Sequence, residues 1–159
     1  MSSDHPSDDL AIADLLRTLY AVISFEEGGE PNWPGLEQVF SRHARITRVT
    51  PEGTDYLDPA SFLAMVRNMV ELGAYTSFFE FELRRAVERF GDIAQVWSAY
   101  ETRRNKSAQE ALGRGVNSIQ LIREHEAWRV LGLLWDETHA DPGLEVAAVF
   151  ARGGRHGQN

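Results

Sequence analysis

The sequence predicts an α+β domain in which helices pack on a curved antiparallel sheet and leave a large interior. Apolar and polar residues alternate through long segments between residues 76 and 138, as they do in half-buried β-strands. Two stretches with apolar residues at helical spacing precede these segments. The chain has 159 residues, of which 43% are hydrophobic, so it can bury one sizeable core without a second domain. These observations predict one small domain with a pocket.

The first helix is expected at residues 10–23. Its apolar residues follow helical spacing and include Ile12, Leu15, Leu16, Leu19 and Ile23. Residues 7–9 precede it with a serine and two aspartates, which supply a cap and negative charge at the helix start. Gly28 and Gly29 then indicate a turn, and Pro34 begins a short second helix.

A short hairpin and a third helix follow. The strands are expected at residues 44–49 and 55–57, on either side of a loop at residues 50–54. Asp58 and Pro59 then begin a helix. Its apolar face comprises Phe62, Met65, Val66, Met69 and Val70. Such a face is typical of core packing. Alternatively, the same helix covers a cavity, where flexible methionines tolerate varied ligand shapes.

Four long strands complete the predicted fold as an antiparallel meander. Their sequences are FFEFELRRAVERF, DIAQVWSAYETRR, GVNSIQLIRE and AWRVLGLLWDE, with breaks at residues 91–92 and 124–126. The domain is expected to cover residues 9–140. Residues 1–8 are polar, and residues 141–159 end in a glycine-rich stretch with little to bury, so both are expected to be tails.

Charge and composition exclude several classes of function. Sixteen Lys and Arg residues against twenty-four Asp and Glu residues give a net charge of −8, which repels phosphate backbones, so we expect no nucleic-acid partner. The absence of cysteine excludes disulfides, thiolate catalysis and cysteine metal sites. No apolar run approaches the roughly 18 residues that span a membrane, because charged residues interrupt residues 11–25. We therefore expect a cytoplasmic protein without a membrane partner.

Two segments resemble the nuclear transport factor 2-like superfamily. They are RRAVERFGDIAQVWSAYETRR and GVNSIQLIREHEAWRVLGLLWDE, whose glycine turn, Tyr-Glu strand end and Trp-Arg strand start are similar to those of SnoaL-like and uncharacterised members. The order of elements between residues 10 and 138 is similar as well. The resemblance implies a cone-shaped, cystatin-like α+β fold with three N-terminal helices packed on a curved antiparallel sheet. The superfamily contains ketosteroid isomerases, dehydratases, polyketide cyclases and plain binding proteins, so it does not assign a function.

The ketosteroid isomerase mechanism does not transfer to this chain. The resemblance places that family's carboxylate base near Arg48, and a guanidinium cannot accept a proton at neutral pH. The family's phenolic acid on the first helix falls near Thr18. Tyr20 is two residues away and turned by roughly 200° around a helix of about 3.6 residues per turn. We therefore expect Tyr20 to contact a ligand rather than to act as that acid.

No sequence motif indicates a metal or a cofactor. Dehydratases of the superfamily use histidines with a carboxylate, and of the five histidines here only His43, beside the first strand, is placed to approach the interior. There is no HxH, HExxH or other metal-ligand spacing. GxGxxG phosphate loops and GxSxG nucleophile turns are absent as well. We expect no metal and no cofactor, and His43 stays a candidate proton carrier.

Aromatic and polar residues are expected around the mouth of the cavity. The predicted ligand-binding residues are Tyr20, Trp33, Met65, Asn117, Trp135 and Glu137. The candidate catalytic residues, as proton carriers, are His43, Tyr56 and Tyr100. Aromatic walls with a few placed donors and acceptors are typical of pockets for mid-sized apolar molecules. The alternative is that these aromatic side chains belong to the packed core or to a dimer surface.

A run of charged residues on the first two long strands has two interpretations. It comprises Glu80, Glu82, Arg84, Arg85, Glu88 and Arg89, which face Glu101, Arg103 and Arg104 across a predicted hairpin. The expected explanation is a set of ion pairs on a solvated face, each worth roughly a few tenths of a kcal/mol. The alternative is a Glu–Arg pair buried inside the cone, whose carboxylate would have a shifted pKa and become a candidate acid or base.

Three functions remain open from the sequence. The first is binding of a small hydrophobic or cyclic molecule in the cavity, without catalysis. The second is an isomerase, dehydratase or polyketide cyclase that uses general acid–base chemistry and no cofactor. The third is a structural or partner-binding subunit whose own side chains fill the cavity. Apolar residues on both strand faces, as in IAQVWSAY and VLGLLW, also predict a homodimer through the outer face of the sheet.

Overall fold

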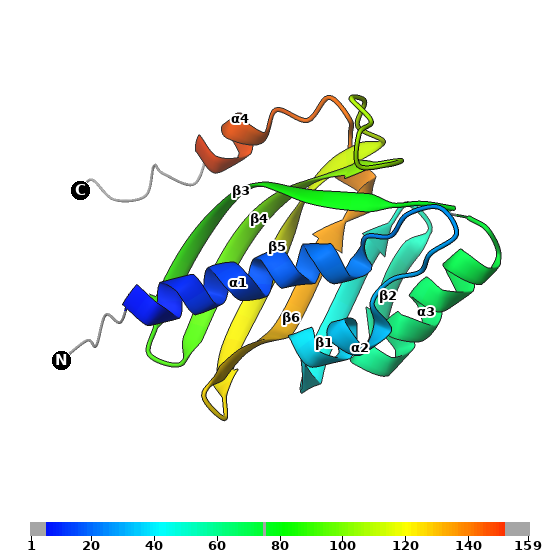
Figure 1. Ribbon diagram of the computed structural model, residues 1–159. Helices are drawn as coiled ribbons and strands as arrows, with labels where there is room; N and C mark the ends of the chain where they lie inside the picture. Colours follow the sequence, from blue (N-terminus) through cyan, green and yellow to red (C-terminus); the bar gives the residue numbers. More distant parts are fainter. Residues whose placement is uncertain (1–5, 75, 152–159) are drawn as a thin grey trace.

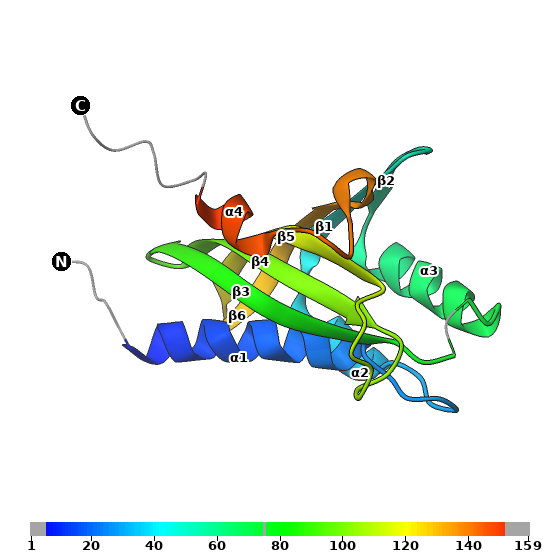
Figure 2. The same ribbon diagram turned by 90° about the horizontal axis from the view of Figure 1, so that it is seen from above.

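The computed structural model describes residues 6–74 and 76–151, which form a six-stranded sheet with helices against it (Figure 1). In chain order the elements are α1 (Pro6–Ile23), α2 (Trp33–Val39), β1 (Phe40–Thr50), β2 (Gly53–Leu57), α3 (Pro59–Glu71), β3 (Phe79–Phe90), β4 (Ile93–Arg103), β5 (Gly113–Glu124), β6 (Ala127–Asp136), η1 (Glu137–His139) and α4 (Val146–Ala151). Figure 2 shows α1 against one face of the sheet and the short α4 on the other side. None of the helices in these ranges is long and apolar enough to cross a membrane. The predicted α+β class is confirmed.

The sheet has the strand order β2-β1-β6-β5-β4-β3, and it is mixed rather than antiparallel. The β1–β2 hairpin and the meander from β3 to β6 are antiparallel, as predicted. β1 and β6, however, pair in parallel, with Ile46 aligned to Leu133. The prediction of a purely antiparallel sheet is therefore wrong at this junction. Alternation within a strand shows which residues share a face, but it identifies neither the neighbouring strand nor its direction.

Local sequence signals place the start of α3 and two hairpin turns where we predicted them. The Asp58 carboxylate accepts a hydrogen bond from the backbone N–H of Ser61 at 2.7 Å, so it caps the helix. Gly91, with φ of 56°, turns the chain between β3 and β4. His125 and Glu126 have φ of 48° and 66° and form the tight turn between β5 and β6.

The apolar face of α1 packs into the core, as its spacing predicts. Ile12, Leu16 and Leu19 on this face are buried against the sheet. The helix begins at Pro6, so it includes part of the range that we expected to be a tail. Likewise, α4 lies within the expected C-terminal tail, and the Arg84 guanidinium lies 4.8 Å from the ring centroid of Phe150, which connects α4 to β3.

The buried aspartate Asp8 connects the first turn of α1 to the sheet. The indole Nε1 of Trp128 donates a hydrogen bond to Asp8 Oδ1 at 3.3 Å. Guanidinium nitrogens of Arg89 and Arg123 each lie 3.6 Å from the same carboxylate. Because these three partners come from β6, β3 and β5, the Asp8 carboxylate connects the helix to three strands at once.

The apolar core occupies the space between α1, α2 and the sheet. Its largest fully buried members include Ile12, Leu16, Leu36, Ile46, Val96, Ile119, Leu121 and Val130. At one edge of this core, Phe62 meets Phe40 and Trp135 edge-on, with ring centroids 5.8 and 6.3 Å apart. The start of α3 thus belongs to the core, and its later turns lie over the pocket described next.

Candidate functional site

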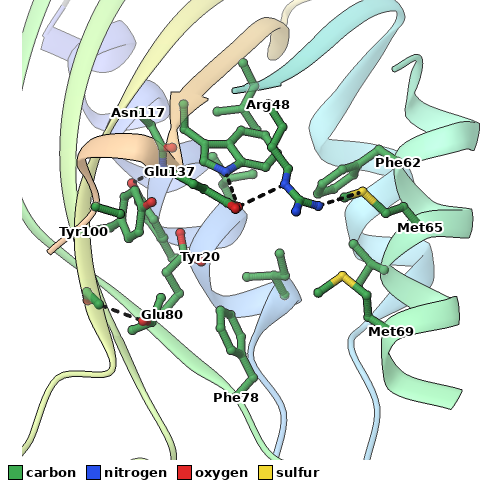
Figure 3. Close-up of a pocket in the computed structure, with 18 of the residues that line it drawn as sticks. Tyr20, Arg48, Phe62, Met65, Met69, Phe78, Glu80, Tyr100, Asn117 and Glu137 are labelled. Atoms are coloured by element: carbon green, nitrogen blue, oxygen red, sulfur yellow. Dashed lines mark hydrogen bonds and ion pairs between the residues drawn. The ribbon is translucent and has the colours of Figure 1, made fainter. Parts of the chain in front are cut away.

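A pocket of about 460 Å³ lies between α1, α3 and the inner face of the sheet (Figure 3). Its mainly apolar lining includes Leu19, Ile23, Phe62, Met65, Val66, Met69, Val70, Phe78, Leu133 and Trp135. Its polar lining includes Tyr20, Arg48, Glu80, Tyr100, Asn117 and Glu137. The volume falls within the roughly 300–1,000 Å³ of small-molecule sites. α3 therefore covers a cavity with its methionines, which is the second of the two sequence interpretations of this helix.

Tyr20 stands at the centre of a buried hydrogen-bond chain on the pocket floor. Asn117 Nδ2 donates to the Tyr20 hydroxyl at 3.1 Å, and that hydroxyl lies 2.7 Å from Ser98 Oγ. The Ser98 hydroxyl donates to Glu82 Oε2 at 2.5 Å, so Tyr20 is the donor to Ser98. Burial, and then the nearby Glu80 carboxylate, raise the pKa of Tyr20 above its usual range. The phenol is therefore a fixed, protonated group that orients Asn117.

Tyr100 presents its phenol to the same pocket from β4, and a glycine makes room for it. Gly115 lies opposite Tyr100 on β5, and a Cβ at that position would lie 2.5 Å from the phenol oxygen. Any larger residue would therefore push the ring away. Burial, followed by the charges of Glu80 and Glu137, raises the pKa of Tyr100. Tyr100 is thus a protonated hydrogen-bond donor at neutral pH.

Glu80 is an ionisable pocket residue that our sequence analysis did not include in the site. It lies near the start of β3, where its backbone N–H donates to Ser24 Oγ at 3.1 Å. Burial raises the pKa of Glu80 to about 7. At neutral pH, the charged and uncharged forms of this carboxyl are therefore present in comparable amounts. Such a group can both accept and donate a proton under physiological conditions.

The sequence analysis missed Glu80 because the charged residues of the segment FEFE, rather than its aromatic residues, face the interior. Glu80 lines the pocket and Glu82 accepts from the buried Ser98 hydroxyl. Phe79 and Phe81 point the other way, where they stack at 6.2 Å and the Arg103 guanidinium lies 5.1 Å from the Phe81 ring centroid. We had expected solvated ion pairs for the whole charged run. Alternation alone cannot tell which of two alternating sets is inside.

Arg48 brings a cation into the pocket from β1. Its Nε lies 3.1 Å from Glu137 Oε1, and its Nη1 lies 3.5 Å from the Met65 sulfur. Glu137 Oε1 also accepts a hydrogen bond from Trp135 Nε1 at 3.0 Å. The sequence carried one signal for this residue, because the resemblance placed a catalytic position of a related family near Arg48. We discarded the position since arginine is not a base, but a pocket can use a cation to bind.

A buried Glu–Arg pairing occurs at Glu101, but not inside the cone as the sequence alternative had it, because Glu101 pairs with Phe81 on the face turned away from the pocket. This carboxylate is only 2% exposed and forms ion pairs with Arg103 and, at 2.7 Å, with Arg114. Burial opposes its ionisation, but the hydrogen bonds from Arg114 and Arg103 outweigh burial and hold the pKa of Glu101 below its usual range. A carboxylate held charged in this way is a structural anchor between β4 and β5 rather than a proton carrier.

Six of the nine predicted site residues line the pocket. They are Tyr20, Met65, Tyr100, Asn117, Trp135 and Glu137. His43 is exposed on β1, where it points away from the core in which the next residue, Ala44, is buried. Its Nε2 accepts a hydrogen bond from Arg42. Tyr56 is 81% exposed on the edge strand β2. Trp33 packs beside the core and donates to Glu30 at 2.7 Å, outside the pocket lining.

The side chains on the pocket determine which ligand chemistry it can support. Across residues 6–74 and 76–151, no group of three or more His, Asp or Glu residues is placed to hold a metal ion. The site combines an apolar wall with the Glu80 carboxyl, whose pKa is raised to about 7, the Tyr100 hydroxyl and the Arg48 guanidinium. The Tyr20 hydroxyl already donates its proton to Ser98. This arrangement can bind an apolar molecule, orient its oxygen atoms and exchange a proton with it.

Solved structures identify the fold. A protein of unknown function with a cystatin-like fold from Nostoc punctiforme PCC 73102 aligns with 89% of this chain and 96% of its own, at a TM-score of 0.67 and 12% identity. A nuclear transport factor 2-like protein of unknown function from Pseudomonas putida KT2440 aligns over 83% and 87% of the two chains, at a TM-score of 0.65 and 11% identity. This chain has the nuclear transport factor 2-like fold.

The nuclear transport factor 2-like fold is shared by proteins with different descriptions. One, described provisionally as an aromatic ring hydroxylase from Novosphingobium aromaticivorans, aligns over 84% of this chain and 91% of its own, at a TM-score of 0.63 and 16% identity. Identities this low show the fold alone. No family model and no curated protein matches the chain. The resemblance inferred from the sequence is confirmed as a likeness of fold, and the function has to be argued from the pocket.

Proposed function

We propose that this protein binds a small, largely apolar molecule, hydrophobic or cyclic, in the pocket beneath α3. The observation that carries this proposal is the cavity of about 460 Å³, in which an apolar wall faces a few polar side chains. Burial of apolar ligand surface against that wall contributes about 25 cal/mol per Å². A cavity of this volume argues against the alternative in which the protein's own side chains fill the interior.

A pocket-filling substitution tests the binding function. We expect 2-acetylnaphthalene to bind the wild-type protein, and Met69→Trp to weaken binding by about tenfold or more because the indole occupies the cavity. Asn68→Trp adds the same indole to an exposed position of α3 and should bind like the wild type. Isothermal titration calorimetry measures the three dissociation constants. Equal constants in all three proteins would show that the probe binds elsewhere and contradict the proposal.

A second candidate function is catalysis by general acid–base chemistry, in an isomerase, dehydratase or polyketide-cyclase-like enzyme. Glu80 favours it, because a carboxyl with a pKa of about 7 is suited to proton transfer at neutral pH. Tyr100 is a protonated donor close enough for Glu80 to raise its pKa. In such a reaction, the Glu80 carboxylate removes a proton beside a carbonyl, and the Tyr100 hydroxyl stabilises the enolate oxygen.

Hydrogen exchange separates catalysis from binding. We expect the wild-type protein to accelerate deuterium uptake at the methyl group of 2-acetylnaphthalene in D₂O, measured by mass spectrometry. Glu80→Gln should lower this rate by about 100-fold, the lower end of general-base contributions, because an amide cannot take the proton. The dissociation constant of the Glu80→Gln variant for 2-acetylnaphthalene should change little. Equal exchange rates with and without the wild-type protein would contradict the catalytic function but not the binding function.

We propose a second copy of this chain as the partner of the outer sheet face, which is the face turned away from α1. Trp97 pairs with Ser118, and Ser118 pairs with Leu134, so the two apolar side chains lie on the same face. They are 51% and 44% exposed. The neighbouring Ser98 contacts Tyr20 of α1, which places Trp97 outside. Exposed large apolar side chains gathered on one sheet face are typical of an interface, and we expect a dimer in solution.

A further inference from the structure

The Arg48 guanidinium lies among the apolar side chains of the pocket, and the residues that the structure describes use only part of its hydrogen-bonding capacity. Its side chain is 23% exposed, so most of it is removed from water. Figure 3 shows it between Glu137 and the methionine-bearing side of α3. A guanidinium carries five N–H donors, and the hydrogen bond that Arg48 makes in the pocket goes to the Met65 sulfur, which is a weak acceptor. Stronger acceptors on a ligand would therefore be bound here.

Glu137 balances the charge of Arg48 without satisfying its donors. The Nε of Arg48 lies 3.1 Å from Glu137 Oε1, yet this N–H is not aligned for a hydrogen bond with any residue that the structure describes. The Trp135 indole holds that same carboxylate oxygen in place. Asp55 is farther from the Arg48 Nε, at 3.9 Å. The pair therefore offers directed N–H groups with little net positive charge.

The charges around the pocket disfavour an anionic ligand. An anion at Arg48 would compete with the Glu137 carboxylate, and it would enter a pocket to which Glu80 adds further negative charge. The chain as a whole carries a net charge of −8. A neutral oxygen acceptor avoids these costs, and a hydrogen bond to a charged donor is stronger than one between neutral groups.

On the basis of the binding function proposed above, we propose that Arg48 determines ligand specificity by donating hydrogen bonds to a neutral carbonyl oxygen of an apolar ligand. Glu137 is its positioning residue, because it orients the guanidinium and cancels its charge. The ligand class is a neutral, mainly hydrocarbon molecule that carries at least one ketone, ester or similar carbonyl. Tyr100 offers a second donor for another oxygen of the same molecule.

Three naphthalene probes of similar size test this assignment. The carbonyl is present in 2-acetylnaphthalene, replaced by an apolar branch in 2-isopropylnaphthalene, and replaced by an anion in 2-naphthoate. We expect the wild-type protein to bind the ketone about tenfold or more tightly than the hydrocarbon at pH 7. Arg48→Met should remove that preference. Arg45→Met removes an exposed cation from the same strand, outside the pocket, and should keep the preference.

Glu137→Gln is expected to increase the affinity for 2-naphthoate, and a folding defect cannot produce such an increase. With the Glu137 charge gone, Arg48 keeps only the more distant and half-exposed Asp55 as a counter-charge, so affinity for 2-naphthoate should rise by about tenfold while ketone affinity changes less. Equal wild-type affinity for ketone and hydrocarbon would overturn the inference and leave the binding function intact. Tightest wild-type binding of 2-naphthoate would overturn the neutral ligand class. If none of the three probes binds, the binding function fails together with the inference.

Discussion

Replacing Glu80 by glutamine is expected to raise the free energy of unfolding at pH 8 by about 3 kcal/mol. Burial raises the pKa of Glu80 from 4.5 to about 7 in the folded protein, and each unit corresponds to about 1.4 kcal/mol. Because the folded pKa is the higher one, the folded state prefers the protonated carboxyl. That contribution to stability is complete below about pH 4.5 and is lost as the pH rises through about 7. Glutamine stays neutral at every pH.

Urea denaturation between pH 5 and pH 8 measures this effect. The difference between Glu80→Gln and the wild type should be small at pH 5, grow with pH, and level off above about pH 7. Other titrating groups change both proteins equally, so the difference isolates Glu80. Glu88→Gln on the exposed part of the same strand should follow the wild-type curve. Parallel curves for Glu80→Gln and the wild type would show that the Glu80 carboxyl is not buried in the pocket.

Asp8→Ala is expected to lower the free energy of unfolding by about 1–3 kcal/mol at pH 7. The Asp8 carboxylate is shared by two mostly buried guanidinium groups, those of Arg89 and Arg123, and it accepts the indole hydrogen bond of Trp128. Removing the Asp8 carboxylate leaves the buried Trp128 indole N–H without its acceptor and weakens the ion pairing of both guanidinium groups, although Asp9 remains near Arg89 and Glu126 remains bonded to Arg123. The first turn of α1 should separate from the sheet before the rest of the protein unfolds.

Asp9→Ala is the matched control for this substitution. Asp9 lies 3.5 Å from Arg89 as well, but its side chain is 72% exposed, and exposed ion pairs contribute only about 0–1 kcal/mol. Urea denaturation of both variants at pH 7 gives the comparison. Equal losses in the two variants would mean that the Asp8 cluster does not anchor the helix.

Those parts of the fold that depend on local chemistry could be predicted from the sequence. The cap at Asp58, the turn at Gly91 and the apolar face of α1 each require a particular residue type at a particular spacing. The parallel pairing of β1 with β6 has no such signal, because it depends on how two antiparallel units meet. The order of elements carried the resemblance that solved structures confirm at the level of fold.

The site was less predictable than the fold for a related reason. Tyr100 and Asn117 were found because aromatic and amide residues on long strands are typical of pockets. Glu80 was not found, because either the aromatic or the charged residues of its segment could face the interior. Only the register of the strands decides between these two sets. His43 and Tyr56 were chosen by residue type, but both side chains are exposed and neither lines the pocket. Side-chain direction, rather than residue type, separates the two groups.

Native mass spectrometry of protein purified from its own host tests the binding function, and denaturing extraction identifies any small molecule that remains bound. We expect one neutral, carbonyl-bearing apolar molecule per chain in the wild type, much less in Met69→Trp, and the mass of a dimer in the same spectrum. The account would be contradicted by wild-type protein that carries no small molecule and also fails to bind 2-acetylnaphthalene when that compound is added.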